Sequence, residues 1–161
     1  MDTVSVFWFR RDLRLEDNAG LWKALKSGHA VLPIFVFDRN ILDKLEDRSD
    51  ARVSFLHDRI TALDQELQVL GSSLKVFYGT PMEAMEALSN AYDVRGVYIN
   101  RDYDPYASAR DTEVFEYWNA KDIAVVGAKD HVIFEKDEVV KGDGTPYLAV
   151  SYTHLTLPTK A

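Results

Sequence analysis

The sequence predicts a doubly wound α/β fold of Rossmann-like type, in which five parallel strands form one sheet. Short apolar runs, rich in β-branched and aromatic residues, lie at 4–9, 30–37, 74–78, 94–99 and 123–126. Segments with helical periodicity separate these runs, so strands and helices alternate along the chain. Because the runs are almost continuously apolar, both faces of the sheet are expected to be covered, as in parallel sheets. The length of 161 residues suits one such domain.

The helix predicted over 51–70 has the clearest pattern. Its apolar residues recur at spacings of three and four, which places them on one face of the helix. They are Val53, Leu56, Ile60, Leu63, Leu67 and Leu70. Gly71 follows directly and suits the left-handed conformation that ends many helices.

Other helices are indicated by capping residues. Ser, Thr, Asp and Asn side chains accept hydrogen bonds from backbone N–H groups at a helix start, and proline fits the first helical position. Asp17 or Asn18 is expected to cap the first helix, which Gly28 closes. A second helix is expected to start at Thr80-Pro81-Met82-Glu83 and to end at about Asn90. A third is expected to start at Asp104-Pro105 and to end near Ala120.

Two residue types bear on packing inside these elements. Pro33 removes a backbone donor from the second strand, which predicts a bulge or locally unpaired backbone there. Trp8, Trp22 and Trp118 are interpreted as core packing, because large aromatic rings bury the most apolar area.

Composition excludes several function classes. The chain has no cysteine, which rules out disulfides and thiolate chemistry and favours a reducing, cytoplasmic setting. The four histidines show no metal-ligand spacing, so no metal site is predicted. A net charge of −7 argues against phosphate-neutralising contact with nucleic acid by this domain. We find no export signal and no apolar stretch of membrane-spanning length.

Polar residues follow the predicted strands where ligands bind in open parallel sheets, outside the carboxyl ends. The segments are 10–14, 38–40, 79–80 and 100–104, and the last is the richest in polar groups. The first lacks the glycine-rich loop of dinucleotide or P-loop sites, which argues against an ordinary NAD-binding or ATP-binding domain. Its arginines are suited to pair with a ligand phosphate or with acids of a neighbouring domain. The alternative is structural pairing of Arg10, Arg11 and Arg14 with Asp12, Glu16 and Asp17.

Blocks of sequence closely resemble the N-terminal domain of the DNA photolyase and cryptochrome family, most of all its class I-like bacterial members. The first is Phe7-Trp8-Phe9-Arg10-Arg11-Asp12-Leu13-Arg14-Leu15 followed by Asp17-Asn18. Further blocks, in the same order as in the family, are 31–38, 41–42, 51–56, 71–74, 100–111 and 130–134. Several spaced blocks in order are far more specific than one short motif. The resemblance covers about 4–148 and ends after Pro146-Tyr147.

The resemblance implies an antenna domain within a longer enzyme. In this family, a helical C-terminal domain holds FAD and receives the damaged base, and light-driven electron transfer from FAD splits cyclobutane pyrimidine dimers. The N-terminal domain commonly binds a light-harvesting chromophore and passes its excitation to FAD. The chain would then meet its own FAD domain as partner and damaged DNA only through that domain, and would be inactive alone. The alternatives are a cryptochrome, which signals without repair, and a generic nucleotide-binding module.

The resemblance also implies which residues hold the chromophore. Arg52, Asp102 and Asp104 match positions that bind it in deazaflavin-type and flavin-type members. Arg10, Phe35, Phe37 and Asp38 are expected to line the slot for its ring. The residue-level alternatives are that Asp104 only caps a helix, that Asp102 is a solvated acid, and that Phe35 and Phe37, which share a strand face, are core residues.

The sequence departs from the family pattern at two places. Folate-type members carry an Asn-Glu pair where this chain has Tyr106-Ala107, so 8-hydroxy-deazaflavin or FMN is expected ahead of methenyltetrahydrofolate. Residues 151–161 contain no acid, and we expect a domain over 1–150 followed by a truncated or non-native tail, with a native edge strand as the alternative.

Overall fold

The computed structural model describes residues 1–47, 50–135 and 138–145, and the chain forms two compact units, 1–131 and 132–161. In the second unit the described part contains the turn predicted at 141–144, where the Gly144 N–H donates to the Lys141 carbonyl at 2.9 Å. The boundary expected at 150 and the tail expected over 151–161 lie outside the described residues.

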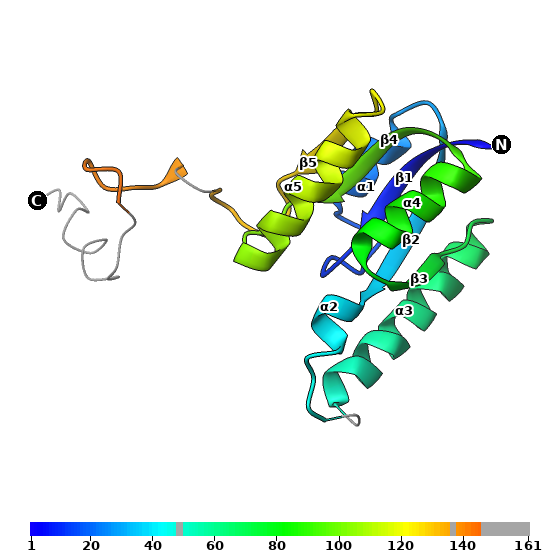
Figure 1. The fold of residues 1–161 in the computed structure, drawn as a ribbon, viewed down its shortest axis with the longest axis horizontal. Coiled ribbons are helices and arrows are strands. Elements are labelled where there is room, and N and C mark those ends of the chain that lie inside the picture. The colour runs from blue at the N-terminus through cyan, green and yellow to red at the C-terminus, as the bar shows by residue number, and fades with distance from the viewer. Residues whose placement is uncertain (48–49, 136–137, 146–161) are drawn as a thin grey trace, which may run out of the picture. The chain divides into compact units, whose positions relative to one another are not determined.

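The first unit confirms the predicted doubly wound α/β fold (Figure 1). Its strands are all parallel and lie in the order β3-β2-β1-β4-β5. In chain order the elements are β1 (Thr3–Phe9), α1 (Ala19–Leu25), β2 (Ala30–Asp38), α2 (Arg39–Leu42), α3 (Ala51–Val69), β3 (Lys75–Gly79), α4 (Pro81–Ala91), β4 (Asp93–Asn100), α5 (Pro105–Asn119) and β5 (Val125–Ala128). The short helix α2 was not predicted.

Both faces of the sheet are buried at the central strand β1, whose successive side chains point to opposite sides. Val6 and Trp8 pack in the cluster that α4 and α5 cover. Phe7 and Phe9 pack in the second cluster, with α1 and α3, and their rings meet edge to face at 4.6 Å. The almost continuous apolar character of the strands therefore has the predicted cause.

The predicted helix starts are confirmed at three helices. The Asn18 side chain accepts from the Leu21 N–H at the start of α1. Thr80 and Glu83 form the capping box of α4. Asp104 caps α5.

The prediction that Gly28 closes α1 is wrong. Helix α1 ends at Leu25, and Lys26 caps it in ordinary right-handed conformation. Gly28, with φ of +83°, instead turns the chain into β2.

Helix α3 packs on the sheet with only part of its predicted stripe. Ile60, Leu63 and Leu67 are buried, but Leu70 is 71% exposed. Gly71, at φ +77°, ends the helix as predicted, and Leu70 lies at the cap, where the chain leaves the core. The N-terminal turns of α3 extend toward the carboxyl end of β2, where they line the pocket described below.

Pro33 does not produce a bulge in the second strand. The β1–β2 register runs unbroken through the Phe7–Pro33 pair. Pairing of β2 with β3 starts only at Ile34, so Pro33 lies where β2 has no neighbour on that side. The missing donor therefore costs no ladder hydrogen bond on that edge.

The interpretation of the tryptophans is correct for Trp8 and Trp118, which are 2% and 0% exposed, and wrong for Trp22. Trp22 is 61% exposed on α1. Gly20, Leu21 and Ala24 supply the buried face of this two-turn helix, which leaves Trp22 on the opposite side.

A buried polar network ties α1 to the carboxyl ends of β1 and β4. The Asn100 amide nitrogen donates to Asp12 and, at 2.8 Å, to Asn18, while its oxygen accepts from the Gly20 N–H at 2.8 Å. A Cβ on Gly20 would lie only 2.6 Å from that oxygen, so the helix approaches β4 this closely because residue 20 is glycine. The Arg10 N–H donates to Asp12 in turn, which fixes the start of the loop after β1.

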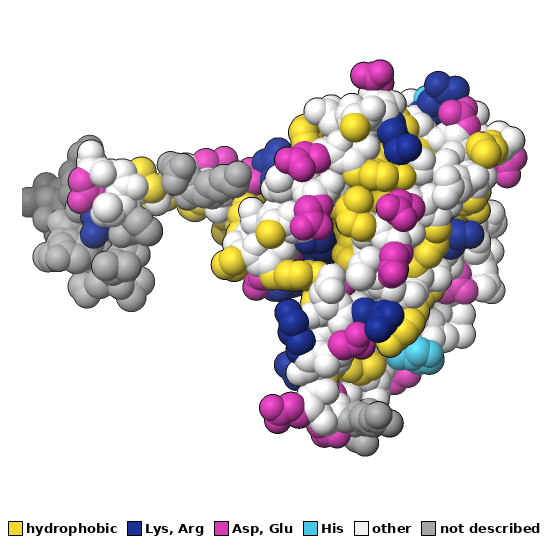
Figure 2. Space-filling model, viewed as in Figure 1, with side chains coloured by type: hydrophobic (Ala, Val, Ile, Leu, Met, Phe, Trp, Pro, Cys, Tyr) yellow, Lys and Arg dark blue, Asp and Glu magenta, His cyan; other side chains and the backbone are white. Residues whose placement is uncertain are grey.

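The surface carries charges of both signs. Figure 2 shows acidic and basic side chains interspersed over the face that α4 and α5 cover. No helix in the described part is long and apolar enough to cross a membrane, and no three His, Cys, Asp or Glu residues there gather as metal ligands.

Candidate functional site

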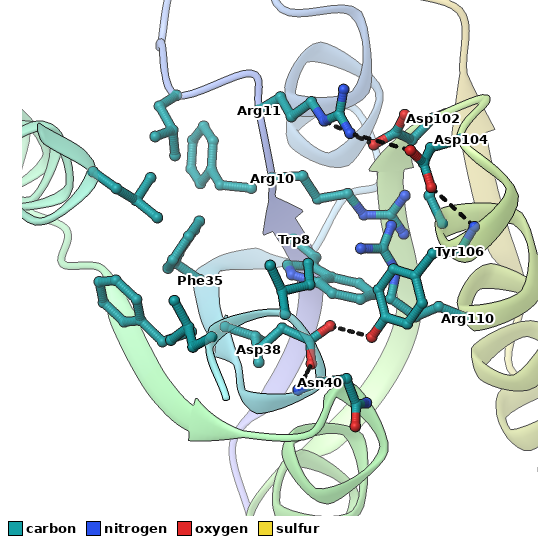
Figure 3. Close-up of a pocket in the computed structure, with 18 of the residues that line it drawn as sticks. Trp8, Arg10, Arg11, Phe35, Asp38, Asn40, Asp102, Asp104, Tyr106 and Arg110 are labelled. Carbon is teal, nitrogen blue, oxygen red and sulfur yellow. Dashed lines mark hydrogen bonds and ion pairs between the residues drawn. The ribbon is translucent and has the colours of Figure 1, made fainter. Parts of the chain in front are cut away.

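A pocket of about 680 Å³ opens at the carboxyl ends of the strands, where ligands bind in this class of fold (Figure 3). The ends of β1 and β2, the loop after β4, and helices α2, α3 and α5 line it. Residues 79–80, after β3, are not among its lining residues, although the sequence suggested that segment.

The structure brings six of the seven predicted binding residues into the lining of this pocket. They are Arg10, Phe35, Phe37, Asp38, Asp102 and Asp104. Arg52 is not in the lining. Its guanidinium is 80% exposed and bonds Asp50, which caps α3, and this contact lowers the pKa of Asp50 to about 2.

The apolar side of the pocket is aromatic. Phe35 and Phe37 point to the same side of β2, as alternation predicts, and their rings meet edge to face at 5.1 Å. Both also contact the core, so the binding and packing interpretations of these residues are compatible. Phe55 from α3 is 73% exposed and lies at the pocket, which makes it an apolar side chain without core function.

Asp38 and Tyr106 bridge the pocket from β2 to α5 (Figure 3). The Tyr106 hydroxyl donates to Asp38 Oδ2 at 2.5 Å, and Asp38 Oδ1 accepts from the Asn40 N–H as the N-cap of α2. Burial, and then the hydrogen bond to Asp38, raise the pKa of Tyr106, so its hydroxyl stays protonated as a donor.

Asp102 and Asp104 lie at the rim with Arg11. The Arg11 guanidinium is 3.2 Å from Asp102 and 3.9 Å from Asp104. Asp104 caps α5 as well, so capping and a place at the pocket do not exclude each other. Asp102 is only 13% exposed, which excludes a simple solvated acid.

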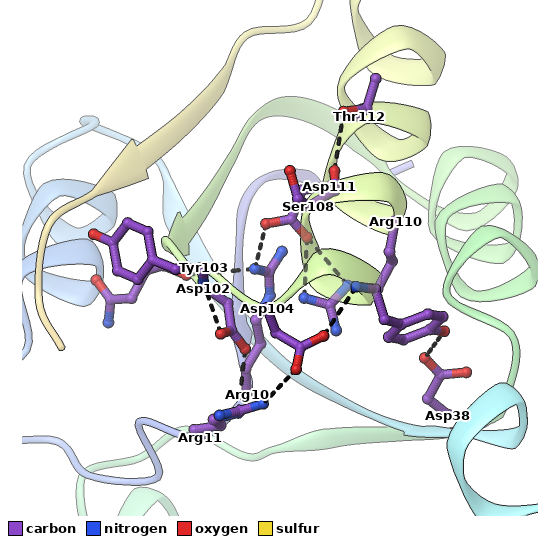
Figure 4. Close-up of polar contacts among 12 residues, drawn as sticks. Arg10, Arg11, Asp38, Asp102, Tyr103, Asp104, Ser108, Arg110, Asp111 and Thr112 are labelled. Atoms are coloured by element: carbon purple, nitrogen blue, oxygen red, sulfur yellow. Dashed lines mark hydrogen bonds and ion pairs between the residues drawn. The ribbon is translucent and has the colours of Figure 1, made fainter. Parts of the chain in front are cut away.

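Arg10 and Arg110 share a single carboxylate behind the pocket (Figure 4). Asp111 accepts from Arg10 Nη1 at 2.7 Å and from Arg110 Nη2 at 3.0 Å. The two guanidinium carbons lie 4.3 and 5.0 Å from the ring centre of Trp8. Burial, and then the charge of Arg110, lower the pKa of Arg10.

The arginines after β1 do not pair with the nearby acids that the sequence suggested. Arg10 pairs with Asp111 and Arg11 with the acids after β4. Arg14 pairs with Asp130 at 2.8 Å, and Asp130 also accepts from the first N–H of α1. Asp102 and Asp130 follow β4 and β5, whose carboxyl ends lie beside that of β1 in the parallel sheet, whereas Asp111 lies on α5.

Sequence reasoning missed the contribution of α5 and α2. Tyr106 and Arg110 stand four residues apart on α5 and therefore on one face, which is the signal that points to a shared wall. Lys44, after α2, and Phe55 also line the pocket. Nothing in the local pattern marks these two.

The family model described as DNA photolyase matches residues 5–154. The chain belongs to the DNA photolyase family. Its fold is that of the photolyase N-terminal domain, as the sequence resemblance predicted.

Its relatives in the family are longer proteins. The deoxyribodipyrimidine photo-lyase of Synechococcus is 34% identical over 142 residues, which cover 88% of this chain and 29% of the relative. A cryptochrome-1 of Aedes aegypti is 28% identical over 151 residues, which cover 89% of this chain and 27% of the relative. The archaeal photolyase of Sulfolobus tokodaii, whose structure holds two FAD molecules with the implication of a novel light-harvesting cofactor, matches with a TM-score of 0.77 and 33% identity over 88% of this chain and 32% of that one. The chain thus spans about a third of their length.

Proposed function

We propose that the pocket binds a light-harvesting chromophore of the deazaflavin or flavin class, 8-hydroxy-deazaflavin or FMN. The observation that carries this is the pocket itself, which combines an aromatic side with charged groups at one end. Its volume of about 680 Å³ lies within the range of small-molecule and cofactor sites. When bound, such a chromophore absorbs light and transfers excitation to a second flavin.

The lining residues are suited to hold a flat heterocycle. Phe35, Phe37 and Phe55 offer apolar surface for ring faces. The carboxylates of Asp38 and Asp102 accept hydrogen bonds from ring N–H or chain hydroxyl groups, and the Arg10 guanidinium donates to acceptors. Asp104 and Arg11 complete the polar end.

The wall formed by α5 favours the flavin class over folate. At 106–107, where folate-type members carry the polar Asn-Glu pair, this chain places Tyr106 and Ala107. The Tyr106 hydroxyl already donates to Asp38, and the Ala107 side chain has no hydrogen-bonding group.

For the parent protein we propose light-dependent cleavage of cyclobutane pyrimidine dimers, with FAD and damaged DNA bound by the part of the protein outside this chain. The naming of the Synechococcus relative as a deoxyribodipyrimidine photo-lyase supports this. The net charge of −7 supports a division of labour in which this domain does not grip DNA.

Titration of the 161-residue chain with FMN, 8-hydroxy-deazaflavin and methenyltetrahydrofolate tests the proposal. Saturable changes in absorption and fluorescence are expected for the first two, with weaker binding of the folate. Phe55→Ala is expected to raise the Kd for FMN about tenfold, because the exposed ring loses stacking area. Phe115→Ala removes a half-exposed ring of α5 outside the pocket and is expected to leave the Kd unchanged. A flat titration with every compound would contradict the proposal.

We propose that Arg52 joins the site when the chromophore binds. It lies one helical turn before Phe55, and its exposed guanidinium is free to leave Asp50 at little cost. We expect Arg52→Ala to raise the Kd for FMN about three- to tenfold, without changing the free energy of unfolding. Arg95→Ala breaks a similar surface pair with Asp93 away from the pocket and serves as control. Equal Kd values for wild type and Arg52→Ala would remove Arg52 from the site.

A further inference from the structure

Arg10 carries guanidinium nitrogens that the described part of the chain leaves without hydrogen-bond partners. Nη1 donates to Asp111 and, at 3.4 Å, to the Asn100 carbonyl. Nε and Nη2 are buried and bond no described group. The side chain is only 4% exposed, and such groups are normally paired because an unsatisfied buried donor is costly. The unpaired nitrogens thus call for an acceptor.

A second cation stands beside them. Arg110 donates from Nε and Nη2 to the same Asp111, and its side chain is 11% exposed. Two guanidinium groups therefore face one carboxylate, and the cluster of Arg10, Arg110 and Asp111 carries an excess positive charge. Both arginines line the pocket and lie against Trp8, whereas Asp111 is not in the lining (Figures 3 and 4).

The other acids of the pocket have partners of their own. Asp102 and Asp104 are within ion-pair distance of Arg11. Asp38 accepts from the Tyr106 hydroxyl and from the Asn40 N–H. These acids therefore do not balance the excess charge at the two arginines, which line the pocket. That charge is largely desolvated, which strengthens its attraction for an anion.

We propose that Arg10 and Arg110 form an oxyanion subsite that takes a phosphate of the chromophore. This rests on the proposed function and makes it more specific: of the two candidate chromophores it selects FMN, which carries a phosphate, over 8-hydroxy-deazaflavin, which does not. Guanidinium groups match phosphate oxygens in geometry and charge, and charge-assisted hydrogen bonds of this kind are among the strongest in proteins. Trp8 holds the two guanidinium groups from the sheet side.

The test compares FMN with riboflavin, which has the same ring without the phosphate. The Kd of each is measured by flavin fluorescence for the 161-residue chain, for Arg110→Met and for Arg39→Met. Wild type is expected to bind FMN at least about tenfold more tightly than riboflavin. Arg110→Met is expected to weaken FMN about ten- to a hundredfold and riboflavin by less than about twofold. Arg39→Met removes the same charge from a surface pair with Asp43 outside the pocket, and is expected to keep the preference for FMN.

The ratio of the two Kd values is measured on one protein sample, so a partly unfolded variant does not change it. Equal affinity of wild type for FMN and riboflavin would overturn the subsite while leaving a flavin site in place. If Arg110→Met raises the Kd of FMN and of riboflavin by the same factor, Arg110 contacts the flavin ring and the phosphate subsite is overturned. Failure of both ligands to bind wild type would contradict the proposed function, and the subsite with it.

Discussion

Asn100→Ala is expected to lower the free energy of unfolding by about 3 kcal/mol or more. The Asn100 side chain is 0% exposed and bonds Asp12, Asn18 and the Gly20 N–H. Truncation leaves the Gly20 N–H buried without an acceptor, and an unsatisfied buried group of this kind costs about 1–3 kcal/mol. It also removes one hydrogen bond each from Asp12 and Asn18, at about 1 kcal/mol per bond. Urea denaturation followed by far-ultraviolet circular dichroism measures the change.

Asn90→Ala is the matched control for this substitution. Asn90 is exposed on α4, and its truncation is expected to change stability by less than about 0.5 kcal/mol. If Asn100→Ala lowers the free energy of unfolding by less than about 1 kcal/mol, the polar network does not stabilise the packing of α1 against the sheet.

Leu63→Ala is expected to lower the free energy of unfolding by about 2–5 kcal/mol. Leu63 is 0% exposed and stands in the middle of the three α3 residues that are buried against the sheet. The cavity left behind weakens the attachment of α3, which also carries Phe55 and Leu56 into the pocket. We therefore expect a higher Kd for FMN in the folded variant as well.

Val69→Ala, on the same helix, removes a side chain that is 87% exposed. Its effect on unfolding is expected to stay within about 0.5 kcal/mol. If both variants unfold at the same urea concentration, α3 is not held by its buried stripe, and the packing described for the second core cluster is wrong.

The sheet and most helices could be predicted because their signals are local. The capping box at Thr80 and the cap at Asp104 each depend on residues within one turn. The errors arose where local signals were incomplete: Trp22 is apolar, but a two-turn helix has room for only one buried face. Pro33 would be discordant only at a position paired with strands on both sides, and pairing partners cannot be read from one segment.

The site could be predicted in part for the same reason. Arg10 and Asp38 lie at the carboxyl ends of strands and were expected at the pocket, where they are found. Their partners Asp111 and Tyr106 are 101 and 68 residues away in sequence, and only the fold brings them together. The sequence pattern offered nearer acids to the arginines, and those are not the partners observed.

The residues at the base of the pocket and those at its outer edge lie on different elements, and the two groups differ in how well substitution is tolerated. Trp8 and Arg10 belong to β1, the central strand, or directly follow it, and their neighbours leave little freedom for substitution. Phe55 and Lys44 stand on α3 and after α2, exposed or nearly so, and no core contact depends on them. Substitutions at the outer edge can therefore alter ligand selectivity at little cost in stability, whereas substitutions at the base are expected to destabilise the whole domain. We therefore expect the architecture to confine changes in ligand selectivity to the periphery of the pocket.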